Sequence, residues 1–515
     1  MSAALLAALL LLPAAPSRAA TVKLFAYDSR GKALDLQGLL ARLGRADDAT
    51  PRSPSAAPFW AYPVDGSTPS RVTLAQDGSL LTATWNGGPA RLDLVWPAPD
   101  DGYGEVWADN DGHCFGDGDA VFLDEAIALT QYRLFKESWK RRTTDWEPLF
   151  APGKRGKRAA DAARDAIAAA ERKQEAPARA AAFEKALHAV SVAWEEELFE
   201  HGRQLAASPR LAKQERFGLT LDASLVPRLN DLKWIAEAVR RSGSNWVRVV
   251  FRPNPADFTY ASLGSFNEYD GAVDLLRKNG ISVMGDILDT TQWPRGMTPA
   301  IYAERVKNIV LHYKGKVAAW EVGSELNGDW LGGSSDPLTP DQVFKIYSAG
   351  AAKAKELDPG AETVATLYWW EATAPDRAHS LSGWLKTFVP RGFGANVDTV
   401  GLEMFPDDNP VGMRFESAFD EVASALPGKR LILSSFGYVE KNRLRGYWWL
   451  APDDVDGGRK DLMILYTTAS CAMRASVCGG FWWQTLDQML PARRHHRATD
   501  LYKVYRRTVT QLRRD

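Results

Sequence analysis

The chain has 515 residues, which is too long for one small core and predicts two or three domains. Its 63 basic residues nearly balance its 64 acidic residues, so charge gives no reason to expect nucleic acid or an anionic membrane as a partner. The 19 tryptophans suit a carbohydrate-binding protein because aromatic rings stack on sugar rings, although large cores would explain them equally well.

Residues 1–20 are typical of a secretory signal peptide. The apolar run Ala3–Leu12 is too short to span a bilayer, and the small residues Ala19 and Ala20 suit a signal peptidase. We therefore expect an exported protein, periplasmic or extracellular, with no transmembrane segment and no membrane partner. The three cysteines allow one disulfide at most, and Cys471 and Cys478 would lie too far apart to bridge if one helix held both.

Residues 21–123 alternate short β-type runs with turns, which predicts a small antiparallel β-sandwich. The expected strands are Thr21–Tyr27, Arg71–Leu74, Leu80–Trp85, Ala90–Trp96 and Gly104–Ala108. The acidic loop 109–119 could suggest calcium, but its spacing fails the EF-hand pattern and favours a solvated turn. The sandwich either binds glycan or braces the next domain, and we favour bracing.

Residues 124–213 carry a helical pattern that links the sandwich to the rest of the chain. We expect helices over 123–146, 159–173 and 178–207, the last with apolar residues at helical spacing. The basic run 154–158 is interpreted as a solvated loop between them.

Residues 214–515 repeat a strand-then-helix rhythm that predicts an α/β fold, a (β/α)8 TIM barrel. The expected strands are Phe217–Leu221, Trp246–Phe251, Ser282–Leu288, Ala318–Gly323, Thr363–Tyr368, Thr399–Phe405, Arg430–Ser435 and Gly480–Thr485. A doubly wound open sheet is the alternative, but no glycine-rich phosphate loop follows the first strand. In a barrel, functional residues gather at the carboxyl ends of the strands.

The segment Trp320–Asn327 carries the clearest chemical signal. Side chains alternate along a strand, so Glu321, Gly323 and Glu325 should share one face, with Glu325 at the barrel mouth. A carboxyl group shielded there can keep its proton near neutral pH and act as a general acid. The alternative is a strand-end glutamate that pairs with an arginine.

This segment resembles the Trp-Glu-Val-Trp-Asn-Glu-Pro-Asn signature of (β/α)8-barrel glycoside hydrolases, and the domain layout resembles xylanase-like bacterial proteins. The resemblance implies that Glu325 is the acid/base. The seventh strand resembles the same family, but the position of the nucleophilic glutamate falls on Ser435. A serine without a base is a poor nucleophile, so we expect Ser435, facing inward with Leu431 and Leu433, only to contact substrate.

Glu403 is the hypothesised second carboxylate. On its strand Thr399, Gly401 and Glu403 should face the barrel axis, while the alternate residues face the helices. Glycoside hydrolysis needs two carboxyl groups beside the bond that is cleaved. Glu403 could instead bind a sugar hydroxyl or an ion-pair partner; Glu371 and Glu440 are weaker candidates for the second carboxylate.

Four further residues are expected to position the sugar: Arg252, Asn327, Trp369 and Trp483. The resemblance implies an arginine at the end of strand two that orients the nucleophile and a tryptophan at the end of strand eight that floors a subsite. Trp293 and Trp330 could add stacking platforms. No cofactor is implied, and the pair His495-His496 has no partner at metal-ligand spacing, so no metal site is expected.

The sequence therefore favours a glycoside hydrolase that acts on an oligosaccharide or polysaccharide. The alternative is a catalytically inactive glycan-binding or scaffolding barrel, which the serine at position 435 favours. A barrel enzyme for phosphorylated metabolites would place a phosphate site at strands seven and eight, and the tryptophan-rich end of strand eight argues against it.

Overall fold

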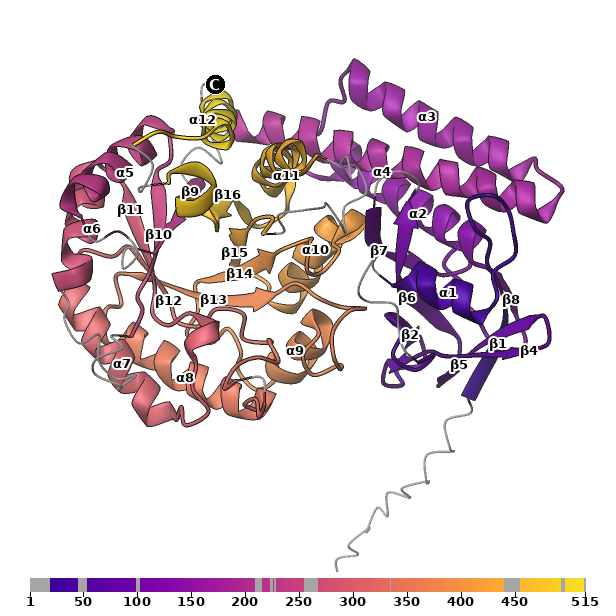
Figure 1. Cartoon of the computed structure of the whole chain (residues 1–515), viewed down its shortest axis with the longest axis horizontal. Coiled ribbons are helices and arrows are strands. Elements are labelled where there is room, and N and C mark those ends of the chain that lie inside the picture. The colour runs from indigo at the N-terminus through magenta and orange to yellow at the C-terminus, as the bar shows by residue number, and fades with distance from the viewer. Residues whose placement is uncertain are drawn as a thin grey trace, which may run out of the picture.

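The computed structural model describes residues 19–44, 53–98, 102–208, 215–222, 226, 228–253, 267–333, 335–439, 454–491 and 496–513. These residues form a β-sandwich, a group of long helices and a closed barrel. Figure 1 shows the sandwich beside the barrel, with the long helix α4 running past both. The expected signal peptide lies outside the described residues, apart from its last two.

The sandwich consists of two four-stranded sheets with the orders β4-β5-β1-β8 and β3-β2-β6-β7. Its strands are β1 Ala19–Phe25, β2 Phe59–Pro63, β3 Ser70–Arg71, β4 Thr73–Asp77, β5 Leu80–Asn86, β6 Ala90–Ala98, β7 Gly102–Ala108 and β8 Ala120–Phe122. The predicted antiparallel β-sandwich is confirmed, and one short edge strand departs from it, since β8 pairs parallel with β1. Sequence analysis missed β8, a three-residue strand that is too short to give a pattern, and also β2 and helix α1 (Leu36–Leu43).

Three long helices connect the sandwich to the barrel: α2 Leu123–Lys140, α3 Lys154–Glu171 and α4 Ala176–Ala206. Pro177 lies in the first turn of α4, where its missing N–H is not needed. The basic run 154–158 opens α3, so its interpretation as a loop was wrong, and Arg155 there contacts Glu196 at 2.5 Å.

The remaining strands close into the predicted (β/α)8 barrel of eight parallel strands. They are β9 Arg216–Leu221, β10 Trp246–Val250, β11 Ser282–Asp286, β12 Ala319–Glu321, β13 Glu362–Tyr368, β14 Thr399–Met404, β15 Arg430–Phe436 and β16 Ser476–Trp482. The helices around them are α5 Leu229–Arg241, α6 Asn267–Lys278, α7 Pro299–Tyr313, α8 Pro340–Leu357, α9 Leu381–Phe388, α10 Phe415–Ala425, α11 Val455–Ala469 and α12 Asp500–Leu512.

Apolar side chains fill the barrel axis at one level. They are Met284, Ala319, Val364, Ile432, Val477 and Phe481. On β14, Val400, Leu402 and Met404 belong to the separate core between strands and helices, as expected. On β15 the expectation was wrong: Ile432 faces the axis, while Leu431 and Leu433 face the helices.

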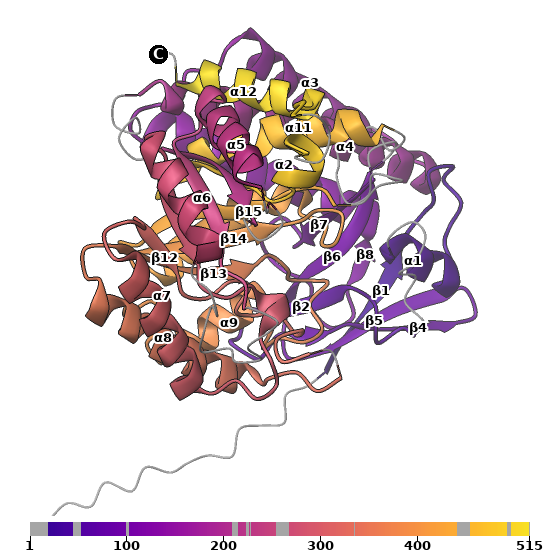
Figure 2. The same cartoon turned by 60° about the vertical axis from the view of Figure 1, so that its left-hand side comes forward.

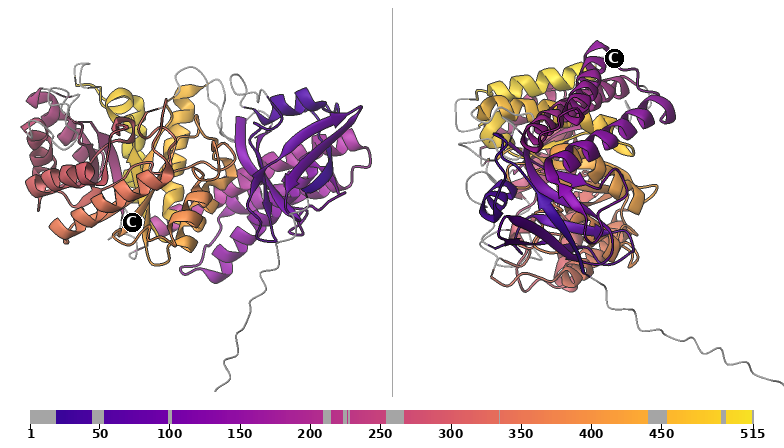
Figure 3. Two further views of the ribbon diagram at one scale, coloured as in Figure 1. Left: turned by 90° about the horizontal axis from the view of Figure 1, so that it is seen from below. Right: turned by 90° about the vertical axis from the view of Figure 1, so that its right-hand side faces the viewer.

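The sandwich contacts the barrel through the segment after β13, and Figures 2 and 3 show the two units side by side from further directions. Trp60 donates its indole N–H to the carbonyl of Ala372 (3.1 Å), whose own N–H is bound by Glu105 (2.8 Å). Tyr62 donates its hydroxyl to Glu371 at 2.6 Å. These contacts join the sandwich to the barrel.

A disulfide joins Cys471 and Cys478. We expected these two cysteines to lie too far apart to bridge only if one helix held both. Instead α11 ends at Ala469, Cys471 lies in the 3₁₀ turn η5 (Ser470–Ala472), and Cys478 lies in β16, which brings the two Cα atoms to 3.9 Å. Across the described ranges no helix combines the length and apolar character that would let it cross a membrane.

Candidate active site

A cavity of about 700 Å³ opens beyond the carboxyl ends of the barrel strands. Barrel enzymes place their reacting groups at this end, because loops from all eight strands meet there. The cavity is lined by Arg248, Asp289, Thr290, Thr291, Ser324, Glu325, Trp330, Tyr368, Glu403, Phe405, Asp407, Asp408, Val439 and Trp483. Glu325, Glu403 and Trp483, three of the predicted site residues, thus lie in one cavity.

Glu325 follows β12 in a tight turn and is not part of the strand, which ends at Glu321. Its φ of 44° is in the left-handed region, which few residues other than glycine adopt and which is frequent at functional sites. Thr290 donates its hydroxyl to the Glu325 carboxyl at 2.6 Å. Burial raises the pKa of Glu325 from its usual 4.5 to about 7, so this group can hold a proton near neutral pH.

Glu403 projects from β14 into the same cavity and is only 3% exposed. Its carboxyl group lines the same cavity as that of Glu325, and each of the two groups shifts the pKa of the other. Burial, and next the negative charge of Glu325, raise the pKa of Glu403 well above its usual value. Two interacting carboxyl groups in a buried site cannot both ionise readily, and their interaction lowers the pKa of Glu325 while it raises that of Glu403.

Arg248 is the positive charge that balances this acidic site, and sequence analysis missed it. Its guanidinium donates to Glu321 (2.6 Å) and Asp286 (3.1 Å), and it lies 3.3 Å from Glu403. Burial alone would lower the pKa of Arg248, but the charges of Glu321 and Asp286 raise it, so the side chain stays a cation. An arginine in the middle of the apolar strand β10 was the available signal, because a buried cation requires carboxylate partners.

Aromatic rings form the walls of the cavity. Trp483, predicted as a subsite floor, has the guanidinium of Arg248 5.2 Å from its ring centroid. Trp330 packs edge-on against Tyr368 with ring centroids 5.1 Å apart, and Phe405 completes the aromatic lining. Trp293 stays in the core, 3% exposed, with its indole N–H bound to the carbonyl of Leu288.

Three residues expected to position the sugar do not line the cavity. Asn327 is fully buried, and its amide bonds to the backbone of Tyr368 and His379 (2.7–3.0 Å). Arg252 pairs with Asp222. Trp369 is 1% exposed, because Tyr368 takes the inward position at the end of β13 and the next residue must point toward the helices.

Ser435, expected to contact substrate, is fully buried and is not part of the cavity lining. The pairing of β14 with β15 shifts by one residue after Leu402, so that Ser434 is the extra residue of a bulge. Its hydroxyl donates to the carbonyl of Leu402 at 3.1 Å, whereas that of Ser435 has no hydrogen-bond partner among the described residues. The described part of β15 therefore brings no carboxylate to the cavity.

The weaker candidates lie elsewhere. Glu371 belongs to the contact with the sandwich, where it accepts from Tyr62 and from Arg377 at 2.6 Å each. Glu440 and His495 are outside the described residues. His496 binds Asp231 at 2.6 Å. No group of three or more potential metal ligands occurs in the part of the chain that the structure covers.

Comparison with known proteins gives similarity in fold only. No family profile matches the chain, and no curated protein sequence does. Among solved structures, a GH10 endoxylanase from a sugarcane soil metagenome is 14% identical with a TM-score of 0.40, covering 57% of this chain and 97% of that one. Xylanase 10B from Thermotoga maritima is 14% identical with a TM-score of 0.40, covering 59% of this chain and 99% of that one. The Ignisphaera aggregans GH53 catalytic domain is 14% identical with a TM-score of 0.39, covering 53% of this chain and 87% of that one. These structural neighbours are glycoside hydrolases, but similarities at this level do not bear on the residues of the cavity.

Proposed function

We propose that the chain is a glycoside hydrolase that acts on an oligosaccharide or polysaccharide, with Glu325 as general acid/base and Glu403 as the second carboxylate. The observation that carries the proposal is the pairing of these two carboxyl groups, from the end of β12 and from β14, in one aromatic-walled cavity. Cleavage of a glycosidic bond needs two carboxyl groups beside the bond, and the cavity supplies both.

The mutual effect of the two carboxyl groups on their pKa values supports a retaining reaction, for which the separation between them must be short. Inversion requires room for a water molecule and a separation of about 6.5–9.5 Å, whereas retention works at about 5–5.5 Å. In the first step the Glu403 oxygen attacks the anomeric carbon while Glu325 gives its proton to the departing oxygen. In the second step Glu325 takes a proton from water, and the oxygen of that water displaces Glu403 from the sugar.

Arg248 supports this division of roles. Attack requires that Glu403 is ionised and that Glu325 carries the shared proton. The guanidinium of Arg248 lies 3.3 Å from Glu403 and opposes the rise in the pKa of that carboxyl group. In the unliganded protein the two pKa shifts favour the proton on Glu403, so the proposed mechanism requires that this proton passes to Glu325 when the sugar binds. Arg248 thus acts as a positioning residue, and the partly exposed ring of Trp483 offers a face against which the sugar can stack.

A panel of neutral glycans tests the proposal. Wild-type protein should hydrolyse at least one member, and Glu325→Gln and Glu403→Gln should each lower kcat by about 10²-fold or more, because each removes a group that reacts in the transition state. Glu371→Gln is the matched control, since Glu371 is a buried carboxylate outside the cavity. Activity that survives both cavity substitutions would refute the assignment of roles.

A glycan-binding barrel without catalysis is the second candidate. The observation that favours it is Ser435, at the position where the resembled hydrolases have their nucleophile. This candidate predicts glycan binding that depends on Trp483 but no turnover on any member of the panel.

We also propose that the protein is exported to the periplasm or the medium. The Cys471–Cys478 disulfide supports this location, because structural disulfides persist in oxidising compartments. Cell fractionation with the cysteines alkylated before lysis would test this location. The chain should be found in the periplasm or the medium, with the Cys471–Cys478 disulfide intact.

A further inference from the structure

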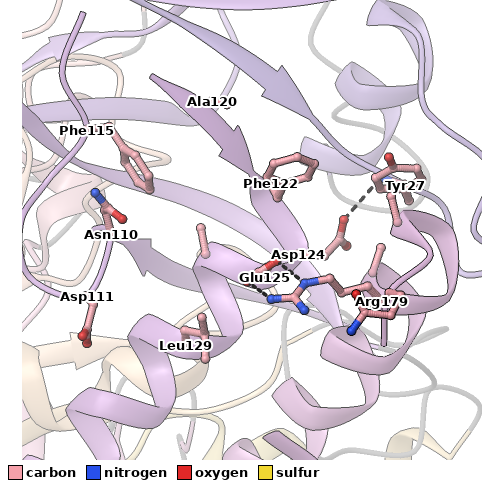
Figure 4. Close-up of a pocket in the computed structure, with 14 residues that line it drawn as sticks. Tyr27, Asn110, Asp111, Phe115, Ala120, Phe122, Asp124, Glu125, Leu129 and Arg179 are labelled. Atoms are coloured by element: carbon pink, nitrogen blue, oxygen red, sulfur yellow. Dashed lines mark hydrogen bonds and ion pairs between the residues drawn. The ribbon is translucent and has the colours of Figure 1, made fainter. Parts of the chain in front are cut away.

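A second cavity of about 490 Å³ lies at the edge of the sandwich, where β8 leads into α2 and α4 begins. Figure 4 shows its lining, with Phe122 on one side and the Glu125–Arg179 pair facing it. None of its lining residues lines the candidate active site. We propose that this cavity is a separate binding site for a neutral sugar unit of a glycan chain.

An exposed aromatic ring provides the stacking surface. Phe122 is 42% exposed, which is high for a large apolar side chain on a well-packed domain. Phe25 stacks behind it, with ring centroids 4.7 Å apart and ring planes 15° apart, because the two residues are register partners of β1 and β8. The stacking fixes the ring in place and leaves an apolar surface of the kind that packs against the C–H face of a sugar ring.

The charged groups that α2 and α4 bring to the cavity are paired with neighbouring charges. Arg179 donates to Glu125 (2.7 Å for one of the two contacts). Asp124 accepts from the backbone N–H of Tyr27 at 3.2 Å and lies 3.8 Å from Arg42. Since each of these carboxylates has a cation beside it, the site does not select a strongly charged ligand. It offers donors and acceptors next to an aromatic ring, which suits a neutral, hydroxyl-rich molecule.

The rim of the cavity is held in an unusual backbone conformation. Asn110 and Asp111 are successive non-glycine residues with φ of 52° and 54°, and each such residue is unfavourable by about 1–3 kcal/mol unless its surroundings impose the conformation. Here Asp109 imposes it, because its carboxylate pairs with Arg133 and accepts the N–H of Gly112 at 3.0 Å. The side chains at 110 and 111 are thereby presented across the cavity from the Glu125–Arg179 pair (Figure 4).

The nature of the occupant follows from these features together. A purely apolar peptide would leave the charged pairs of the wall without polar neighbours, and a phosphate would meet an arginine that already pairs with Glu125. No group of three or more potential ligands for a metal ion occurs among the described residues. The volume falls in the range of about 300–1,000 Å³ that is usual for small-ligand sites. The inference does not require Glu325 and Glu403 to be catalytic; if they are, the second site would hold the same polymer at a distance from the reacting bond.

Titration calorimetry with cellohexaose, xylohexaose and mannohexaose tests the proposal on the full chain carrying Glu325→Gln, which prevents turnover. We expect at least one of these glycans to bind at two sites. Phe122→Ala should weaken one site at least tenfold, and Trp483→Ala should weaken the other. Val64→Ala is the matched control, because Val64 is also an exposed apolar residue of the sandwich, at 67% exposure, and does not line the cavity.

Asn110→Ala gives a second variant that leaves the aromatic stack intact, and it should weaken the same site as Phe122→Ala. Hydrolysis of a small aryl glycoside by otherwise wild-type protein should be unchanged by Phe122→Ala. Binding at a single site that only Trp483→Ala removes, or no effect of both sandwich variants, would overturn the proposal. Sugar binding that depends on Phe122 in a protein that hydrolyses no glycan would instead leave this site standing and refute the proposed hydrolase activity.

Discussion

The substitution Glu325→Gln should stabilise the folded protein at alkaline pH. Burial raises the pKa of Glu325 from its usual 4.5 to about 7 in the folded state. A carboxyl group with a raised pKa favours folding when it is protonated, and this contribution is lost as the pH rises from the unfolded pKa to the folded one. One pKa unit corresponds to about 1.4 kcal/mol, so the wild-type protein should lose at most about 3 kcal/mol between pH 4.5 and 7.

Glutamine does not ionise, so the variant avoids this loss. The free energy of unfolding can be measured for both proteins by urea unfolding followed by tryptophan fluorescence. The value for the variant minus that for the wild type should be about 2 kcal/mol larger at pH 8 than at pH 5. Glu356→Gln is the control, because Glu356 is exposed on α8 and pairs with Lys353, and neither residue lines the cavity. A difference that does not change with pH would refute the reasoning, and so would one that favours the wild type at pH 8.

Three further results are expected. Arg248→Met should destabilise the barrel by about 3–5 kcal/mol in urea unfolding, because it leaves Glu321 and Asp286 buried without their cation; a change below 1 kcal/mol would contradict the ion-pair network. Trp483→Ala should raise KM for a cleaved glycan about tenfold, whereas Trp369→Phe should leave KM unchanged, and equal effects would show that the cavity walls are misassigned. Reduction of the disulfide should lower the free energy of unfolding by about 2 kcal/mol, measured with and without dithiothreitol, and identical curves would argue that the bond does not constrain the chain.

The barrel could be predicted because its local signals agree with its fold. Strands β10, β11, β14 and β15 begin at the predicted residue. Both α7 and α8 begin with a threonine cap followed by proline, Thr298-Pro299 and Thr339-Pro340, which is a strong start signal in a single sequence. Glu325 and Glu403 were found in the same way, since each lies at or just beyond the end of an expected strand.

The rest of the site depends on contacts between distant segments. The bulge at Ser434 shifts the register of β15, and a shift of one residue exchanges the inward and outward faces of a strand. The alternation of side chains along β13 likewise decides that Tyr368 points into the barrel and Trp369 toward the helices. The role of Arg248 depends on its contacts with the carboxylates of β11, β12 and β14, which lie 38 or more residues away in sequence.

Labelling of Glu403 is the most direct measurement of the central claim. A panel of activated 2-deoxy-2-fluoro glycosides would be incubated with the protein, and the modified peptide identified by mass spectrometry after digestion. The proposed mechanism predicts one sugar bonded to Glu403, formed by the wild-type protein and absent from Glu403→Gln. A sugar attached to any other side chain would contradict the pairing of Glu325 with Glu403, and so would glycan hydrolysis that inverts the anomeric carbon.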